Sequence, residues 1–316
     1  QGSLGRLETL VAEICEIQET LQPELDPACL LLFASDHGLA NDGVSAYPRA
    51  VTAQMVLNFL RGGAAANVLS AQTGCTLRII DVGVDDDFTP HPQLMQAKVA
   101  RGTASILHAD AMSAEELERA LAAGREAAQE ALRAGHRVVL FGEMGIGNTT
   151  SAAAISCALF GGVAEDWVGR GTGVDDAGLA RKATAVGAGV ARLTSREPLA
   201  VLAALGGREI AAMAGAMLRA RTLRIPVILD GFIACSAAAI LHALAPTALD
   251  HCVAGHASAE AAHTRLLAAL NKAPLLSLGL RLGEGSGAAL AIGIVQAAAA
   301  CHSGMATFAE AGVAAG

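Results

Sequence analysis

The chain has 316 residues, of which 53% are hydrophobic and 3% aromatic, and its 22 basic and 30 acidic residues give a formal net charge of −8. This length allows one large domain or two smaller ones. The acidic balance and the lack of any basic run or stripe argue against nucleic acid as a partner. Much of the hydrophobic fraction is alanine, which favours closely packed helices.

Seven cysteines are spread along the chain, an odd number without any CxxC pair. This pattern indicates neither a disulfide framework nor a zinc site, and it predicts buried free thiols in a reducing compartment. The sequence does not open with a signal-peptide pattern, and an apolar stretch such as Gly287 to Ala300 is shorter than the roughly 20 residues of a membrane span. We therefore expect a cytoplasmic protein that does not enter a membrane.

Short apolar runs alternate with long helical patterns, which predicts parallel βαβ units and an α/β fold with a Rossmann-like, three-layer parallel sheet. Capping residues mark the helix starts, as in the capping-box pattern of Ser113 and Glu116. In chain order, the predicted elements are an amphipathic helix over Leu4–Leu21, a strand over Cys29–Ala34, a helix over Thr52–Leu69 that contains Gly62-Gly63, a strand over Leu77–Val82, a helix from Ser113 toward Gly135, a strand over Arg137–Phe141, a helix capped by Asp175 or Asp176 that runs through Leu179 and Val190, strands over Pro226–Leu229 and His251–Ala254, a helix opened by Ser258 and Glu260, a strand over Leu275–Leu278, and a last helix opened by Glu284 and Ser286.

Small or polar residues follow most of the predicted strands. In open α/β sheets, ligands bind at the carboxyl ends of the strands, so each of these tails is a candidate wall of one site. The tails are Ser35-Asp36-His37-Gly38, Asp81-Val82-Gly83, Gly142-Glu143, Asp230-Gly231 and Gly255-His256. The acidic run Asp85-Asp86-Asp87 is typical of a solvated loop.

The segment Gly142 to Thr150, GEMGIGNTT, lies between a strand and a helix. Its glycines allow a tight turn with exposed N–H groups, and a helix start favours an anion, so a phosphate fits there. The Walker A lysine is missing, so NTP hydrolysis is not implied. A plain strand-to-helix turn is the structural alternative.

A second glycine turn, Gly169 to Gly173, precedes the helix that carries Lys182, one of only three lysines. From the first turns of a helix, this lysine could reach a phosphate as a point charge. On this stretch alone, a solvated surface lysine is the better interpretation. The turn does not fit GxGxxG, so it gives little support to dinucleotide binding.

Two further segments carry candidate side chains. Glu284, set among glycines in LGEGSG, is either a base that substrate can approach closely or an ordinary helix N-terminal residue. The stretch from Ser35 to Gln54 combines turn residues with Tyr47, the single tyrosine. There, Asp36 and His37 could form a charge pair, although a histidine after a strand is more often a structural residue.

Together these segments resemble the nicotinate-nucleotide–dimethylbenzimidazole phosphoribosyltransferase family of cobalamin biosynthesis. The matching blocks follow the family's order and cover nearly the whole chain, and GEMGIGNTT and LGLRLGEGSGAA are highly specific. The Gly255–His263 stretch departs from the family pattern at Ala257 and Ala261-Ala262. The other blocks are DHGLANDGVSAYP (36–48), VTAQMVLNFLRGGAAANVL (51–69), GRGTGVDD (169–176), PVILDGFIA (226–234) and MATFAEAGV (305–313).

The resemblance implies transfer of ribose 5-phosphate from nicotinate mononucleotide to 5,6-dimethylbenzimidazole, without a metal or other cofactor. It implies a large α/β domain over 27–287, a small helical subdomain from 1–26 with 288–316, and a homodimer with active sites near the interface. Glu284 is expected to be the general base and Glu143 the second functional carboxylate. The expected base pocket is Ser45, Tyr47, Gln54 and Met55. The expected nucleotide and phosphate site is Gly145, Gly147, Asn148, Thr149, Thr150, Gly171, Thr172, Gly173, Lys182 and Gly283.

The residues alone leave two other classes of function possible. The α/β pattern and glycine turns would fit a nicotinamide-cofactor oxidoreductase, but GxGxxG with its downstream acidic residue is missing. A non-catalytic protein that binds a nucleotide or a benzimidazole would keep the pocket without turnover, and the two glutamates, Glu143 and Glu284, argue against it.

Overall fold

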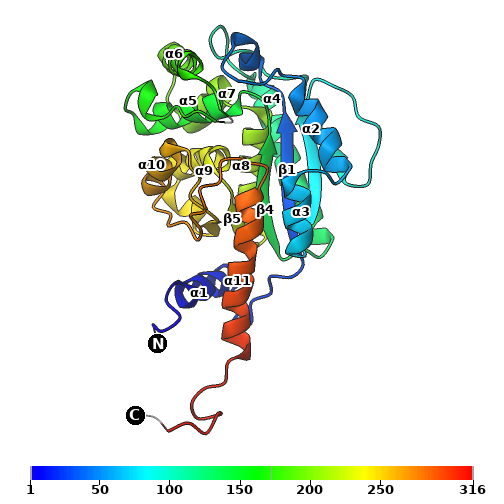
Figure 1. Cartoon of the computed structure of the whole chain (residues 1–316), viewed down its shortest axis with the longest axis vertical. Helices are drawn as coiled ribbons and strands as arrows, with labels where there is room; N and C mark the ends of the chain where they lie inside the picture. Colours follow the sequence, from blue (N-terminus) through cyan, green and yellow to red (C-terminus); the bar gives the residue numbers. More distant parts are fainter. Residues whose placement is uncertain (1, 172, 315–316) are drawn as a thin grey trace.

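The computed structural model describes residues 2–171 and 173–314. Its centre is a sheet of parallel strands in the order β3-β2-β1-β4-β5-β6. Figure 1 shows helices covering both faces of this sheet. The α/β class and the parallel sheet predicted from the sequence are therefore confirmed. The strands are β1 Ala28–Ser35, β2 Thr76–Gly83, β3 Leu94–Gln96, β4 Val138–Met144, β5 Val227–Leu229 and β6 Cys252–Ala254.

Alternation along β1 explains why both faces need helices. Successive side chains of a strand point to opposite faces. Leu31 and Phe33 belong to the core beneath α4 Ala114–Arg133 and α8 Arg208–Thr222, whereas Leu30 and Leu32 belong to the core on the other face, with α11 Ser286–Gly304. All eight residues of β1 are buried, as expected of a central parallel strand.

The remaining helices are mostly short and alanine-rich. Two predicted helix caps are observed. Ser113 Oγ accepts from the N–H of Glu116 at the start of α4, and Asp175 Oδ1 accepts from the N–H of Gly178 at the start of α6. The helices are α1 Arg6–Gln18, α2 Val51–Leu60, α3 Ala65–Gln72, α5 Asn148–Phe160, α6 Asp176–Arg192, α7 Pro198–Leu205, α9 Phe232–Leu244 and α10 Ala261–Ala269, with 3-10 turns η1 Gly38–Asp42, η2 Ala164–Asp166 and η3 Pro246–Leu249.

Two predicted elements differ from the structure, and one strand was not predicted. The single helix over Thr52–Leu69 is two helices, because Gly62 is left-handed at φ 80° and ends the first. The predicted strand over Leu275–Leu278 is wrong: it forms one isolated bridge, between Leu276 and His256, after Pro274, which has no N–H to donate. The edge strand β3 was not predicted, since its two apolar residues, Leu94 and Met95, stand between Gln93 and Gln96 and do not form an apolar run.

Helix α11 corrects the argument from length against a membrane span. With 19 residues it is long and apolar enough to cross a membrane. However, its residues Ala288 to Ile292 are largely buried against the sheet, and core helices of this kind pass the same test.

The two ends of the chain meet on one side of the molecule. Helix α1 packs against α11, and Figure 1 shows α1 beside the lower half of α11, below the sheet. These are the elements from which the sequence predicts a small helical subdomain over 1–26 and 288–316, a division that stays a prediction.

Candidate active site

A cavity of about 690 Å³ lies where strands β4, β5 and β6 end. Three of the five predicted strand tails line it, through Glu143, Gly231 and His256, together with the loop before α11 and residues of α2. The tails after β1 and β2 do not line it, and Asp36 faces a second hollow. The lining residues are Ser45, Tyr47, Val51, Met55, residues 143–149, Gly171, residues 231–233, His256, Ser258, Glu260 and residues 279–284. One cavity therefore combines glycine-rich backbone, two buried glutamates and apolar side chains.

The segment after β4 places a carboxyl group beside a helix start. Glu143 is 7% exposed and accepts a hydrogen bond from the side-chain amide of Asn148, the first residue of α5. Burial raises the pKa of Glu143 to about 8, and the neighbouring carboxylates Glu209, Asp230 and Glu284 act in the same direction. At neutral pH this carboxyl group therefore holds its proton and can donate a hydrogen bond.

The same segment, residues 145–149, has the backbone geometry expected of an anion cradle. Gly147 caps α5 at φ 98°, a left-handed conformation that a side chain would strain. A Cβ on Gly145 would lie 2.5 Å from the carbonyl oxygen of Ser35, so only glycine fits this close approach. The N-terminal end of α5 faces the cavity and favours a negative group there.

Glu284 sits in a turn of three consecutive left-handed residues, Gly283, Glu284 and Gly285, at φ 81°, 64° and 79°. The left-handed conformation costs a non-glycine residue roughly 1–2 kcal/mol. The side chain is 6% exposed, its Oε2 has no hydrogen-bond partner within the described residues, and burial raises its pKa. A buried carboxylate at a cavity wall, with one oxygen free of hydrogen bonds within the described residues, is suited to accept a proton.

Lys182 lies behind the cradle and does not line the cavity. Its Nζ donates to the carbonyl oxygen of Gly169 at 2.9 Å and lies 3.3 Å from Thr149 Oγ1. The residue is 3% exposed, and burial lowers its pKa. The interpretation as a solvated surface lysine is thus wrong. The Lys182 ammonium contacts both glycine-rich segments, at Thr149 and at Gly169.

Of the other predicted residues, some line the cavity and some do not. Ser45, Tyr47, Met55, Gly171 and Gly283 line it. Thr150 is buried within α5 and Gly173 is exposed outside the lining. Gln54 faces a second hollow, and Thr172 lies outside the described residues.

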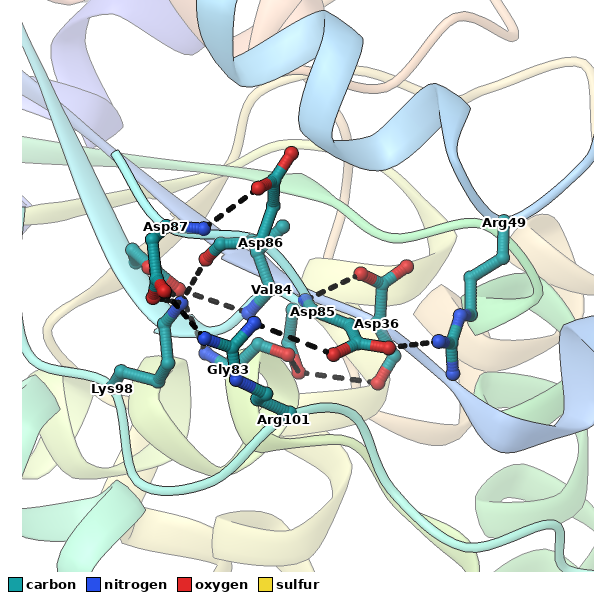
Figure 2. Close-up of polar contacts among 11 residues, drawn as sticks. Asp36, Arg49, Gly83, Val84, Asp85, Asp86, Asp87, Lys98 and Arg101 are labelled. Carbon is teal, nitrogen blue, oxygen red and sulfur yellow. Dashed lines mark hydrogen bonds and ion pairs between the residues drawn. The ribbon is translucent and has the colours of Figure 1, made fainter. Parts of the chain in front are cut away.

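The second hollow, of about 260 Å³, lies beside the acidic loop after β2. Figure 2 shows how this loop is neutralised. Arg49 pairs with Asp85, Arg101 reaches Asp85 and Asp87 at 3.6 and 2.6 Å, and Lys98 lies 3.6 Å from Asp87. The run is solvated as expected, with Asp86 and Asp87 exposed, and Asp85 and Asp87 are in addition ion-paired.

His37 pairs with a residue that the sequence did not indicate. Its Nε2 lies 2.7 Å from Glu209 Oε1 and its Nδ1 lies 3.1 Å from Ser151 Oγ, and all three side chains are buried. The partner is thus Glu209 of α8 and not Asp36, whose Oδ2 instead accepts from the N–H of Asp85. The His37 ring also packs against Gly145, where an added Cβ would lie 3.3 Å from its Cδ2.

Sequence reasoning gave no role to Asp230, His256, Glu260 and Arg281. Asp230 and His256 stand in predicted strand tails, which was the available signal. His256, Glu260 and Arg281 line the cavity, and Arg281 donates to the carbonyl oxygen of Gly171 at 3.0 Å. Asp230 lies beneath the cavity wall, 3.4 Å from His256 Nε2.

Comparison with known proteins gives a consistent result. A family model described as phosphoribosyltransferase matches residues 1–313. A nicotinate-nucleotide–dimethylbenzimidazole phosphoribosyltransferase of Ruegeria pomeroyi is 55% identical, over 99% of this chain and 87% of its own length. One of Roseobacter denitrificans is 54% identical, over 100% and 88%. The crystal structure of CobT from Thermus thermophilus is 47% identical with a TM-score of 0.97, over 100% of this chain and 95% of that one.

Proposed function

The chain belongs to the nicotinate-nucleotide–dimethylbenzimidazole phosphoribosyltransferase family, and from this premise we propose how its cavity performs the reaction. The enzyme transfers ribose 5-phosphate from nicotinate mononucleotide to 5,6-dimethylbenzimidazole, giving α-ribazole 5′-phosphate and nicotinate. The observation that carries the assignment of roles is the single cavity that holds Glu143, Glu284 and the Gly145–Thr149 cradle. The comparisons do not favour the oxidoreductase alternative.

The phosphate of the nucleotide is proposed to bind at the start of α5. The helix dipole and the glycine-rich backbone favour an anion there, and the buried ammonium of Lys182 adds a positive charge behind Thr149. Because Glu143 keeps its proton below a pKa of about 8, it does not repel this anion at neutral pH.

Glu284 is proposed as the general base. One ring nitrogen of the benzimidazole attacks C1′ of the ribose as the bond to nicotinate breaks, and that bond's electron pair returns to the pyridine nitrogen. The acceptor's other ring nitrogen must lose its proton, and the Glu284 carboxylate takes it. Attack from the face opposite the leaving group inverts β to α. General base catalysis of this kind contributes roughly 10²–10⁴ in rate.

The flat acceptor is proposed to lie between apolar side chains of α2 and the loop before it. Met55 and Tyr47 line this part of the cavity, Tyr47 being 48% exposed. Few aromatic residues are present, so Val51, Met144 and Leu282 contribute to its enclosure.

The assembly and compartment are also proposals. We expect a homodimer, since Leu278 and Leu282 are 59% and 50% exposed on and beside the segment that lines the cavity. We expect a cytoplasmic enzyme, in keeping with seven cysteines that are free thiols in the described chain.

The reaction is tested by incubating the protein with nicotinate mononucleotide and a panel of bases, with products identified by mass. The panel includes dimethylbenzimidazole, benzimidazole, adenine and a phenol. Release of nicotinate together with an α-ribotide of dimethylbenzimidazole supports the assignment. Bound nucleotide without any product would support the non-catalytic alternative instead.

A further inference from the structure

We propose that Asp230, supported by His256, is the positioning residue that holds the general base Glu284 in its left-handed turn, an inference that rests on the function proposed above. Neither residue is assigned a role by the motifs, and the argument starts from how α11 begins. Asp230 follows β5 and is 1% exposed.

Helix α11 has no cap of its own. Its N-cap is Gly285, which has no side chain to accept from the first N–H groups of the helix. By contrast, α4 is capped by Ser113, which lies next to its first residue. The cap of α11 comes instead from another strand: Asp230 Oδ2 accepts from the N–H of Gly285 at 3.2 Å, and Oδ1 accepts from that of Ala288 at 3.0 Å.

These two bonds join β5 to the residue directly after Glu284. Because Gly283, Glu284 and Gly285 are all left-handed, the turn needs fixed partners on both sides to stay in place. On one side, the carbonyl of Glu284 packs against Gly142, where an added Cβ would lie 2.6 Å from the oxygen. On the other side, the carboxylate of Asp230 holds Gly285.

His256 packs beside Asp230 from the end of β6. Its Nε2 lies 3.4 Å from Asp230 Oδ1, an ion-pair distance without a hydrogen bond, and the ring is 3% exposed. The ring occupies the space that a Cβ on Gly287 would need, in the first turn of α11. Asp230 and His256 therefore fix the start of α11 from two neighbouring strands, and with it the direction of the Glu284 side chain.

A double-mutant cycle tests this role. Asp230→Asn keeps the size but removes the charge and one of the two acceptors. We expect kcat to fall by as much as roughly 10²-fold, the effect of a misplacement of about 1 Å, with little change in KM for nicotinate mononucleotide. In a Glu284→Gln background the same substitution should change the residual kcat little, because residues that act as one unit are not additive.

The matched control is Ser113→Ala, which removes the cap of α4, a residue that does not line the cavity. It should lower the thermal stability while leaving kcat unchanged. Should Asp230→Asn not fold, His256→Gln carries the test, with a smaller kcat loss that also disappears in the Glu284→Gln background.

Equal fold-losses in both backgrounds, or a change confined to KM, would overturn the positioning role. This outcome is distinguishable from failure of the proposed mechanism. If Glu284→Gln alone retains full kcat, the base role fails, and the positioning role fails with it. If Glu284→Gln is impaired but the losses add, the positioning role alone is overturned.

Discussion

Nζ of Lys182 lies 2.9 Å from the carbonyl oxygen of Gly169 and 3.3 Å from Thr149 Oγ1. A single buried ammonium thus joins the glycine turn before α6 to the start of α5. The lysine therefore adds a positive charge at the point where the two segments meet, in keeping with the phosphate site proposed there.

Replacing Lys182 with alanine should therefore weaken nucleotide binding selectively. Loss of a charged hydrogen-bonding group amounts to about 1.5–3 kcal/mol, or roughly 10- to 100-fold in KM for nicotinate mononucleotide. The KM for the base should change much less. Lys98→Ala is the control, since Lys98 pairs with Asp81 and Asp87 outside the cavity. Equal changes in both KM values would argue against a phosphate contact.

The hydrogen bond from Asn148 to Glu143 does not offset the burial of that carboxyl group, which has a pKa of about 8 against an ordinary 4.5. The folded protein then binds a proton that the unfolded chain has lost, so this group's stabilising effect is complete below pH 4.5 and is lost as pH rises to about 8. The slope is at most ~1.4 kcal/mol per pH unit. Urea unfolding across this range should show a flatter pH dependence for Glu143→Gln, and an unchanged slope would refute the raised pKa.

Gly283 should not tolerate a side chain. Its φ is 81°, and a Cβ would lie 2.5 Å from Glu143 Oε1, so Gly283→Ala strains the backbone and displaces the carboxyl group. We expect a loss of at least ~1–2 kcal/mol in unfolding free energy, together with lower kcat. The control is Gly187→Ala in α6, where nothing lies within 4 Å, and where alanine should stabilise by roughly 0.5–1 kcal/mol. Similar stability for the two variants would contradict the close approach.

Shortening Met55 should affect the acceptor more than the nucleotide. The side chain is half-buried and lines the cavity from α2, so its truncation removes part of the roughly 1.5–3 kcal/mol of transfer free energy of a fully buried apolar side chain. Met55→Ala is expected to raise the KM for dimethylbenzimidazole while the KM for nicotinate mononucleotide stays near its original value. Steady-state kinetics with each substrate varied in turn measures both KM values. An unchanged KM for dimethylbenzimidazole would show that the acceptor binds elsewhere.

The sequence predicted the central features of the fold because they depend on local signals. Apolar runs placed β1, β2 and β4, and the Ser113 capping box placed α4, since both patterns act within a few residues. Two features without such a signal were not predicted. β3 has only two apolar residues, which stand between glutamines, and the break between α2 and α3 depends on the left-handed Gly62.

The candidate site was predictable where glycine motifs mark it and not where distant residues meet. The segments around Glu143 and Glu284 were indicated by their own residues and line one cavity. By contrast, the partner of His37 is Glu209, 172 positions away, and the cap of α11 is Asp230, 55 positions before Gly285. These partners come together only when the strands take their order in the sheet, so no local sequence pattern predicts the pairs.

The most direct test of the mechanism is kcat of Glu284→Gln with nicotinate mononucleotide and dimethylbenzimidazole, measured on protein shown to be folded by its thermal transition. A kcat lowered by roughly 10²–10⁴, with residual turnover from positioning alone, is the predicted result. An unchanged kcat would contradict the assignment of Glu284 as the group that takes the proton.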